Sequence, residues 1–288
     1  MTKARITVEN VIDRSYCTIT STVTPVTTFD LDFLKNMDRD KFARIPATAS
    51  IDIKFTWGGD SVVVNMCSMN RINSEPADTD RFRAYASADW TGAAIVDTTA
   101  QQSVPSLALG DLAFGIDPLG TNLFDSFLGQ KMNTRYFAEQ TIGSAILTID
   151  ATANAQGVFD MARFFLGKSY ELEANPVYGA GLRWNHNGRR NPRSKGGSPM
   201  NMRGSAWREA EFDLKLLLEA DADMWMSAGR FLLEDKDFHF ALFPDVAGNT
   251  FTDAQIRNHT GLWIFEKLPG VIAASYGRSD TSTLIVES

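Results

Sequence analysis

The amino-acid sequence predicts a mainly β protein built in two parts. Apolar and polar residues alternate with a period of two through most segments, strand-like runs recur between turn residues, and long stretches with the 3.6-residue period of a helix are scarce. The chain has 288 residues. This is about twice the usual length of a single domain, so it can hold two cores or one large β-sandwich with additions.

The first half of the chain supplies most of the predicted strands. In residues 45–57, Ile51, Ile53 and Phe55 alternate with Asp52 and Lys54, which is the pattern of a half-buried strand. An apolar run at 61–69 ends at the polar turn 70–80. Four further strands are expected at 81–90, 93–99, 144–150 and 158–167.

The second half adds strands at 208–218, 238–244, 261–268 and 282–288. Two short helices are also expected. One would begin after Thr28 and Asp30, which can cap a helix N-terminus. The other would occupy 220–235, where acidic residues at the amino end precede an apolar face.

Composition and charge exclude several classes of protein. The chain has 28 Lys and Arg against 35 Asp and Glu, a net charge of −7, which argues against binding to a phosphate backbone. It is 44% hydrophobic and 22% charged, as globular proteins are. Cys17 and Cys67 stand far apart without a CxxC motif, and we expect buried free thiols. We expect neither a secretion signal nor a membrane span.

One segment departs from this composition. Residues 183–208 are rich in Gly, Asn, Ser and Pro and contain no acidic residue. Their basic residues are Arg183, Arg189, Arg190, Arg193, Lys195, Arg203 and Arg208. We interpret the segment as an exposed basic arm. The arm could lie on an acidic face of a neighbouring copy, remain a solvated loop or bind a polyanion, and the acidic net charge favours the subunit contact, with Arg183, Arg189, Arg190, Arg193, Lys195 and Arg203 as the interface residues.

The arm also marks the expected domain joint. We expect a β-sandwich domain with an N-terminal extension over residues 1–180 and a linker formed by the arm over 181–208. A smaller β domain with a helix would then follow over 209–288. Loops of this length without secondary structure are uncommon inside a compact domain, which is why the joint is placed there.

The sequence shows no HExxH, GxSxG, P-loop, GxGxxG or EF-hand pattern. It has three histidines, His186, His239 and His259. His239 lies between two aromatic residues in a predicted strand, where a structural role is expected. A glycoside hydrolase would need two carboxylates in one cleft, but the close pairs Asp30/Asp32 and Asp221/Asp223 stand where helix N-termini favour negative charge. We expect no enzymatic activity, no cofactor and no metal.

Several stretches, taken in order, resemble one family. IPATASIDIKF, an apolar strand ending at NRIN, RFRAYASADW and an IVDT strand resemble the opening of tail-tip proteins of long-tailed bacteriophages that carry a discoidin-like jelly roll. Residues 134–167 resemble its closing strands, and NPVYGAGLRW, the basic arm and FDLKLLLEAD resemble the passage into the second half. The resemblance runs patchily over 45–288. It departs at Asn70-Arg71-Ile72-Asn73, where the family often has a His-Asn pair.

The resemblance implies a galactose-binding-like jelly-roll sandwich and a structural protein of the virion. Such a distal or minor tail protein, made in the host cytoplasm, would form a trimeric or hexameric ring that joins the tail tube to the tip or baseplate. Its implied partners are other copies and other tail-tip and tail-tube proteins, without nucleic acid or membrane. The alternative is a carbohydrate-binding module that contacts host surface glycans through loops such as 70–80. In that case an exposed Trp57 or Trp90 would stack on a sugar.

Overall fold

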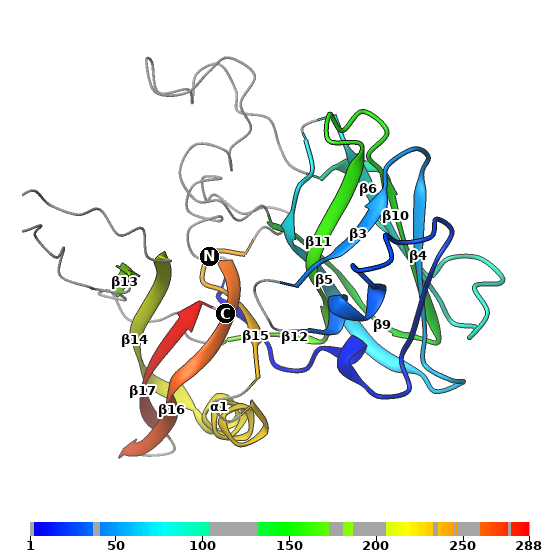
Figure 1. Cartoon of the computed structure of the whole chain (residues 1–288). Coiled ribbons are helices and arrows are strands. Elements are labelled where there is room, and N and C mark those ends of the chain that lie inside the picture. The colour runs from blue at the N-terminus through cyan, green and yellow to red at the C-terminus, as the bar shows by residue number, and fades with distance from the viewer. Residues whose placement is uncertain are drawn as a thin grey trace, which may run out of the picture. The chain divides into compact units, whose positions relative to one another are not determined.

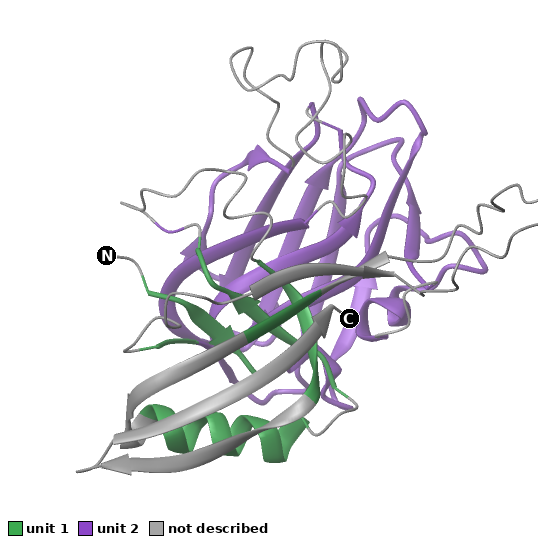
Figure 2. Cartoon of the chain, turned by 90° about the vertical axis from the view of Figure 1, so that its left-hand side faces the viewer, with its two compact units in different colours: residues 1–8, 170–244, 249–288 green, residues 9–169, 245–248 purple. Residues whose placement is uncertain are grey.

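A computed structural model of the chain describes residues 3–36, 41–75, 77–103, 132–172, 181–186, 206–232, 236–244, 246, 260–275 and 278–287. The strands of these residues form three antiparallel sheets (Figure 1). The chain divides into two compact units (Figure 2). One unit comprises residues 9–169 and 245–248, and the other comprises 1–8, 170–244 and 249–288.

The first unit is a jelly-roll β-sandwich, as the sequence and the resemblance predict. Its six-stranded sheet has the order β2-β4-β10-β6-β7, with β8 also paired to β6, and its four-stranded sheet has the order β3-β11-β5-β9. The six-stranded sheet contains β2 (Thr18–Ser21), β4 (Ile51–Thr56), β6 (Thr79–Tyr85), β7 (Val96–Asp97), β8 (Gln101–Gln102) and β10 (Ser144–Asp150). The four-stranded sheet contains β3 (Ala43–Pro46), β5 (Val62–Ile72), β9 (Met132–Ile142) and β11 (Val158–Gly167). Successive strands alternate between the two sheets from β2 to β6 and from β8 to β11, which is the jelly-roll connectivity.

The period-two pattern explains how this sandwich closes. On β4, Ile53 and Phe55 are fully buried, whereas Asp52 and Lys54 lie on the outer face. The Phe55 ring stacks on Phe164 of β11, with ring centroids 5.1 Å apart. The inner faces of the two sheets therefore share one hydrophobic core.

Residues 9–44, which precede the first stretch of resemblance, also belong to this unit. Within residues 9–36, the side chain of Asn10 donates a hydrogen bond to the Phe164 carbonyl oxygen at 2.9 Å. Arg163 of β11 forms two contacts of 2.7 Å with the Asp13 carboxylate. The extension thus packs against β11 and is tied to it by polar bonds.

The structure confirms one predicted helix and shortens the other. α1 (Glu219–Leu232) matches the helix expected at 220–235. After Asp30 the chain forms only one 3-10 turn, η2 (Leu31–Lys35), and the Asp30 side chain makes no capping hydrogen bond. Five residues are too few for a stable α-helix without such a cap.

The second unit is a seven-stranded sheet with α1 on one face (Figure 2). Its order is β12-β1-β15-β16-β17-β14-β13. The strands are β1 (Arg5–Thr7), β12 (Ser169–Glu171), β13 (Gly181–His186), β14 (Ala206–Leu218), β15 (Phe238–Ala241), β16 (Thr260–Ser275) and β17 (Arg278–Glu287). The buried Trp225 of α1 meets Phe240 and Phe265 edge to face, with centroids 6.4 and 6.1 Å apart.

This division differs from the expected boundaries at 180 and 209. β1 pairs with β15, with Arg5 opposite Ala241, so the first eight residues complete the sheet of the second unit. β13 occupies the start of the expected arm and pairs with β14, with Arg183 opposite Glu209. Arg183 is therefore a strand residue, because the hairpin strands extend into the basic segment. Arg189, Arg190, Arg193, Lys195 and Arg203 lie outside the described residues.

Two smaller expectations concern the cysteines and the membrane. Cys17 and Cys67 are buried free thiols, as predicted. Burial raises the pKa of Cys17 to about 11 and that of Cys67 to about 12, so both are protonated at neutral pH. Within the part of the chain that the structure describes, no helix is long and apolar enough to cross a membrane.

Candidate functional site: the outer face of the six-stranded sheet

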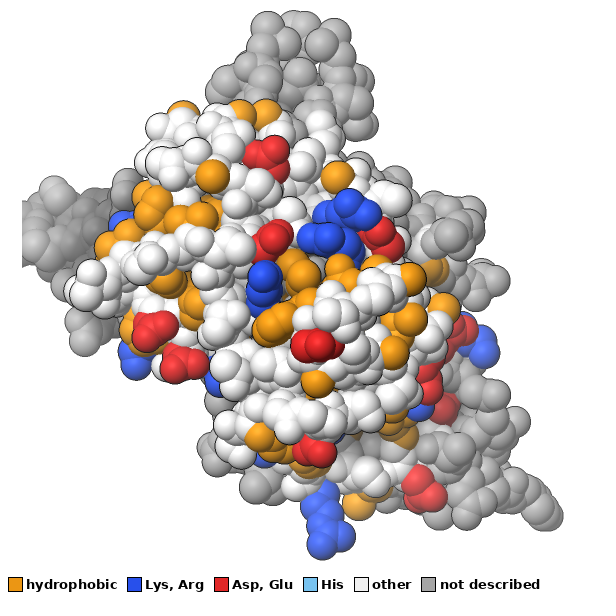
Figure 3. All heavy atoms as spheres, turned by 90° about the vertical axis from the view of Figure 1, so that its right-hand side faces the viewer, with side chains coloured by type: hydrophobic (Ala, Val, Ile, Leu, Met, Phe, Trp, Pro, Cys, Tyr) orange, Lys and Arg blue, Asp and Glu red, His pale blue; other side chains and the backbone are white. Residues whose placement is uncertain are grey.

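Polar side chains cover the outer face of the six-stranded sheet. Two adjacent cross-strand rows run over β4, β10 and β6: Asp52, Thr148 and Arg81 in one, and Lys54, Ile146 and Arg83 in the other. Because neighbouring strand residues point to opposite faces, all six side chains point away from the core. On this side of the molecule, basic and acidic side chains are interspersed with hydrophobic ones (Figure 3).

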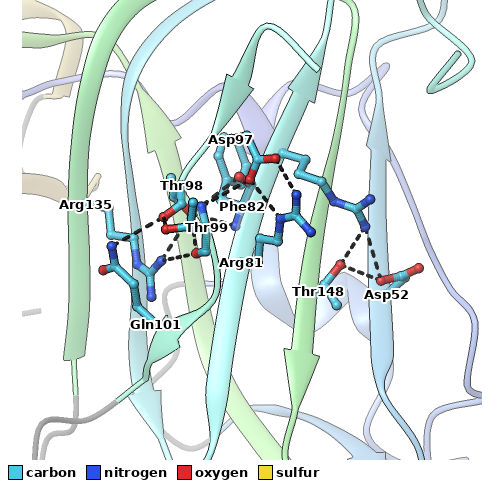
Figure 4. A network of polar contacts seen from close by, with 10 residues as sticks. Asp52, Arg81, Phe82, Asp97, Thr98, Thr99, Gln101, Arg135 and Thr148 are labelled. Atoms are coloured by element: carbon cyan, nitrogen blue, oxygen red, sulfur yellow. Dashed lines mark hydrogen bonds and ion pairs between the residues drawn. The ribbon is translucent and has the colours of Figure 1, made fainter. Parts of the chain in front are cut away.

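Hydrogen bonds link three of these groups to one another and a fourth, Arg81, to Asp97 (Figure 4). The Arg81 guanidinium holds Asp97 of β7 through two parallel contacts, one of them 2.8 Å from Nε to Oδ1. These hydrogen bonds lower the pKa of Asp97 to about 2. Arg83 donates to Thr148 Oγ1 at 2.9 Å, and Thr148 in turn donates to Asp52 Oδ1 at 2.6 Å.

A second Arg–Asp pair joins a strand of one sheet to a strand of the other. Arg135 of β9 approaches Asp80 of β6 at 2.6 Å, and their side chains are only 9% and 2% exposed. Asn133 donates to the same carboxylate at 2.9 Å, and Arg135 also donates to Thr98 Oγ1 at 3.1 Å. Burial raises the pKa of Asp80, and the Arg135 charge opposes that rise. This pair joins strands of opposite sheets and is structural.

Trp90 lies at the end of the same sheet, in the turn that follows β6. Its indole Nε1 donates to the carbonyl oxygens of Phe55 at 3.2 Å and of Ala145 at 3.1 Å. Its backbone N–H donates to Ser144 Oγ at 3.1 Å. The side chain is partly exposed, and the Lys54 ammonium lies 5.4 Å from the ring centroid. The ring is thus fixed beside the row that contains Lys54.

The turn that carries Trp90 is braced against the sheet. A Cβ atom at Gly143 would lie 2.6 Å from the Ala86 carbonyl oxygen, so only glycine permits this approach. Ser144 Oγ donates to the Ser87 carbonyl oxygen at 2.7 Å, and Thr56 Oγ1 donates to that of Ala88 at 3.1 Å. These contacts hold the backbone from which the indole projects.

Trp57, the other expected glycan contact, lies in the core. Its side chain is 0% exposed, and Nε1 donates to the Val11 carbonyl oxygen at 2.9 Å. Trp57 continues the inward phase of Ile53 and Phe55 beyond the end of β4, which explains its burial. It is therefore not available to stack on a sugar.

The loop 70–80 is shorter and more enclosed than expected, because β5 extends to Ile72 and β6 begins at Thr79. Asn73 donates to the Val158 carbonyl oxygen at 2.9 Å and accepts from the Asp160 N–H at 2.7 Å. The buried Asp78 accepts from the Glu75 N–H at 2.7 Å. Burial raises the pKa of Asp78. The polar groups of Asn73 and Asp78 are therefore used in hydrogen bonds within the chain.

The catalytic candidates considered from the sequence that the structure describes lie on separate elements. His239 is buried on β15, where burial lowers its pKa to about 3. The side chain of His186 and all of His259 lie outside the described residues. Asp32 lies 3.4 Å from Lys35 on η2. Among the residues with described side chains, no group of His, Cys, Asp and Glu is arranged to hold a metal.

Lys54, Arg81 and Arg83 were not predicted from the sequence as functional candidates. Charged residues on the outward phase of a strand have the same sequence pattern as an ordinary solvated face. The sequence does show that these residues alternate with apolar ones, Asp52 and Lys54 on β4 and Arg81 and Arg83 on β6. This alternation was the feature from which an outward-facing position could have been predicted. That phase predicts a common face but not which strands are neighbours.

No protein-family model and no curated protein sequence matches the chain. Solved structures similar to it include a GH29 fucosidase of Ruminococcus gnavus in complex with fucose (9% identity, TM-score 0.39, covering 57% of this chain and 27% of the fucosidase). A second is chitosan-binding module 1 of a Paenibacillus chitosanase/glucanase (9% identity, TM-score 0.37, covering 55% of this chain and 98% of the module). A third is the family 32 carbohydrate-binding module of Clostridium perfringens NanJ in complex with galactose (8% identity, TM-score 0.36, covering 58% of this chain and 99% of the module). All three TM-scores are below 0.5, and the jelly-roll assignment rests on this chain's own strand order.

Proposed function

We propose that this chain is a non-enzymatic structural protein of the tail tip of a long-tailed bacteriophage. It would act in the virion as a distal or minor tail protein, in a ring of identical copies between the tail tube and the tip or baseplate. The observation that carries the proposal is that the stretches resembling that family coincide, in order, with structural elements. They fall on β3 to β7, on β9 to β11, and on the passage from β14 into α1.

The chemistry of the described side chains also supports a scaffold. Arg81 with Asp97, Arg135 with Asp80, and Arg163 with Asp13 satisfy one another within the sandwich. Such ion pairs help to set which strands are neighbours and in which register they pair. The paired side chains are engaged with each other and are not placed to transfer protons to a substrate.

Charge distribution provides a mechanism for ring formation. The seven cations of residues 183–208 leave 21 basic and 35 acidic residues in the rest of the chain, a net charge of −14. A basic arm that lies on the acidic body of the next copy makes a head-to-tail contact, and closed rings are built from such contacts. The arm residues Arg189, Arg190 and Arg193 would be central to this contact.

Light scattering and negative-stain electron microscopy of the full chain test the ring. We expect closed trimers or hexamers that dissociate as salt concentration rises. A variant with Arg189→Ser, Arg190→Ser and Arg193→Ser should yield monomers, whereas a control with Lys3→Ser, Lys41→Ser and Lys168→Ser should keep the ring. Equal assembly of the two variants would contradict the proposed role of the arm.

The second candidate function is binding of host surface carbohydrate through Trp90. The specific observation is a partly exposed indole whose only polar atom is already satisfied by two carbonyl oxygens, which leaves the ring as a rigid apolar surface. A glycan array with the full chain tests this function. Hits that disappear in Trp90→Ala would support it, and the absence of any hit for the wild-type chain would remove it.

A further inference from the structure

The region around Trp90 combines a strained backbone with a rigid ring. Trp90 has a φ of 60°, a left-handed conformation that bulky residues rarely adopt. Glycine adopts it freely, as Gly92 does two residues later at 89°. Such strain persists only where surrounding contacts impose it, and it concentrates at functional sites. Here the two indole hydrogen bonds and the bond from the Trp90 N–H to Ser144 impose it.

The charge beside this ring is positive. Lys54 makes no ion pair with any carboxylate of the described residues, and its ammonium lies by the indole instead. An exposed cation–π contact contributes only about 0.5–1 kcal/mol, so an anion can draw Lys54 away from the ring at small cost. Arg83 stands in the same cross-strand row, separated from Lys54 by Ile146.

The carboxylates beside Arg83 accept hydrogen bonds from other groups. Asp97 lies opposite Arg83 on β7 and is held by Arg81. Asp52 accepts the Thr148 hydroxyl at 2.6 Å, and its ion pair with the Arg83 guanidinium, at 3.9 Å, is longer than a hydrogen bond. The Arg83 side chain is 25% exposed and can therefore still be reached from solvent. An anion placed over Ile146 would meet Lys54 on one side and Arg83 on the other.

We propose that Trp90, Lys54 and Arg83 form a binding site for a saccharide that carries a carboxylate, such as a sialic or uronic acid. The apolar face of the pyranose stacks on the indole, and the carboxylate receives charge-assisted hydrogen bonds from Lys54 and Arg83. This inference rests on the second proposed function and names its class of ligand. The site lies on the face of the sheet rather than in the turn 70–80, whose polar groups bind the protein itself.

Isothermal titration of the full chain against matched ligand pairs tests the site. The pairs are 3′-sialyllactose with lactose, and trigalacturonate with its methyl ester. We expect the acidic member of a pair to bind about tenfold more tightly, and this preference to shrink as salt is raised. Lys54→Gln should bring the two members of each pair to about equal affinity. Lys168→Gln is the matched control, because Lys168 is paired with Glu139 at another position, and it should leave both affinities unchanged.

The outcomes separate this inference from the function on which it rests. Equal binding of acidic and neutral members would overturn the acidic ligand and leave carbohydrate binding in place. A preference that survives Lys54→Gln would overturn the assigned site. No binding of any saccharide in these pairs or on the array would overturn both. Trp90→Phe, checked for folding by circular dichroism, should weaken both members of a pair, because it keeps an aromatic ring but loses the indole anchor.

Discussion

Two Arg–Asp pairs on β6 and its neighbouring strands shift the pKa of their aspartates in opposite directions. Asp80 and Arg81 are consecutive residues and point to opposite faces of the sheet. Arg81 and Asp97 are 41% and 34% exposed, and contact with the guanidinium lowers the pKa of Asp97 to about 2. Asp80 lies within 2.6 Å of Arg135, yet burial raises its pKa.

The difference shows that burial, and not the partner, decides what each pair does. Inside the sandwich a carboxylate loses its hydration, and the ion pair holds two sheets in one arrangement because neither member can be left alone. On the outer face, water replaces a lost partner at small cost. Groups such as Lys54 and Arg83 can therefore exchange their present contacts for those of a ligand, which is why the candidate site lies on that face.

The largest effect is expected from Arg135→Met. It leaves the Asp80 carboxylate buried without its cation, and we expect the free energy of unfolding at pH 7 to fall by about 3–5 kcal/mol. Urea denaturation followed by circular dichroism measures this. The paired replacement Arg135→Met with Asp80→Leu should recover most of the loss, because no charge is then buried. A loss below about 1 kcal/mol for the single variant would break the contrast between the two pairs.

His239 extends the comparison to the second unit. Burial lowers its pKa to about 3, so folding disfavours its charged form. Stability should be fully present above the unfolded pKa near 6.5 and should fall by about 1.4 kcal/mol per pH unit below it, until the pH reaches the folded value. Denaturation curves at pH 7 and pH 5 measure the slope. His239→Gln should show a shallower slope, and an unchanged slope would refute the assignment.

A smaller effect is expected from Asp78→Asn. Burial raises the pKa of Asp78, so its contribution to stability is present below the unfolded pKa near 3.9 and is lost as pH rises through the folded pKa. The amide oxygen can still accept the Glu75 N–H. We expect the variant to be more stable than wild type at pH 7 by about 1 kcal/mol and equal to it at low pH. A variant less stable at neutral pH would contradict the role of burial.

The smallest effect is expected from Arg81→Ala on the outer face. Water replaces the lost contact to Asp97, so the thermal unfolding midpoint at pH 7 should stay close to that of wild type. The direct readout is the titration of Asp97, followed by NMR. Its pKa should rise from about 2 toward the ordinary value for aspartate, because Arg81 contributes most to the shift. An unmoved pKa would show that other groups hold Asp97.

The sequence predicted two strands of the sandwich with the bounds that the structure shows. Residues 144–150 and 158–167 are β10 and β11, apolar runs that are buried on nearly both faces and bounded by turn residues. Alternation could not reveal that β1 joins β15, since that pairing spans more than 230 residues. Whether a tryptophan is exposed also depends on the fold, and nothing in the residue type distinguishes Trp57 from Trp90. Trp57 is buried because it continues the inward-facing positions of β4.

We propose that identical copies of this chain form a scaffold in a phage tail tip. Electron cryo-microscopy of purified particles of the phage that encodes it, with mass spectrometry of their proteins, tests that claim most directly. We expect a threefold or sixfold ring of jelly-roll units at the junction of tube and tip, with residues 187–205 lying on the next copy. Particles that lack the chain, or that hold a single copy without neighbours of its own kind, would contradict it.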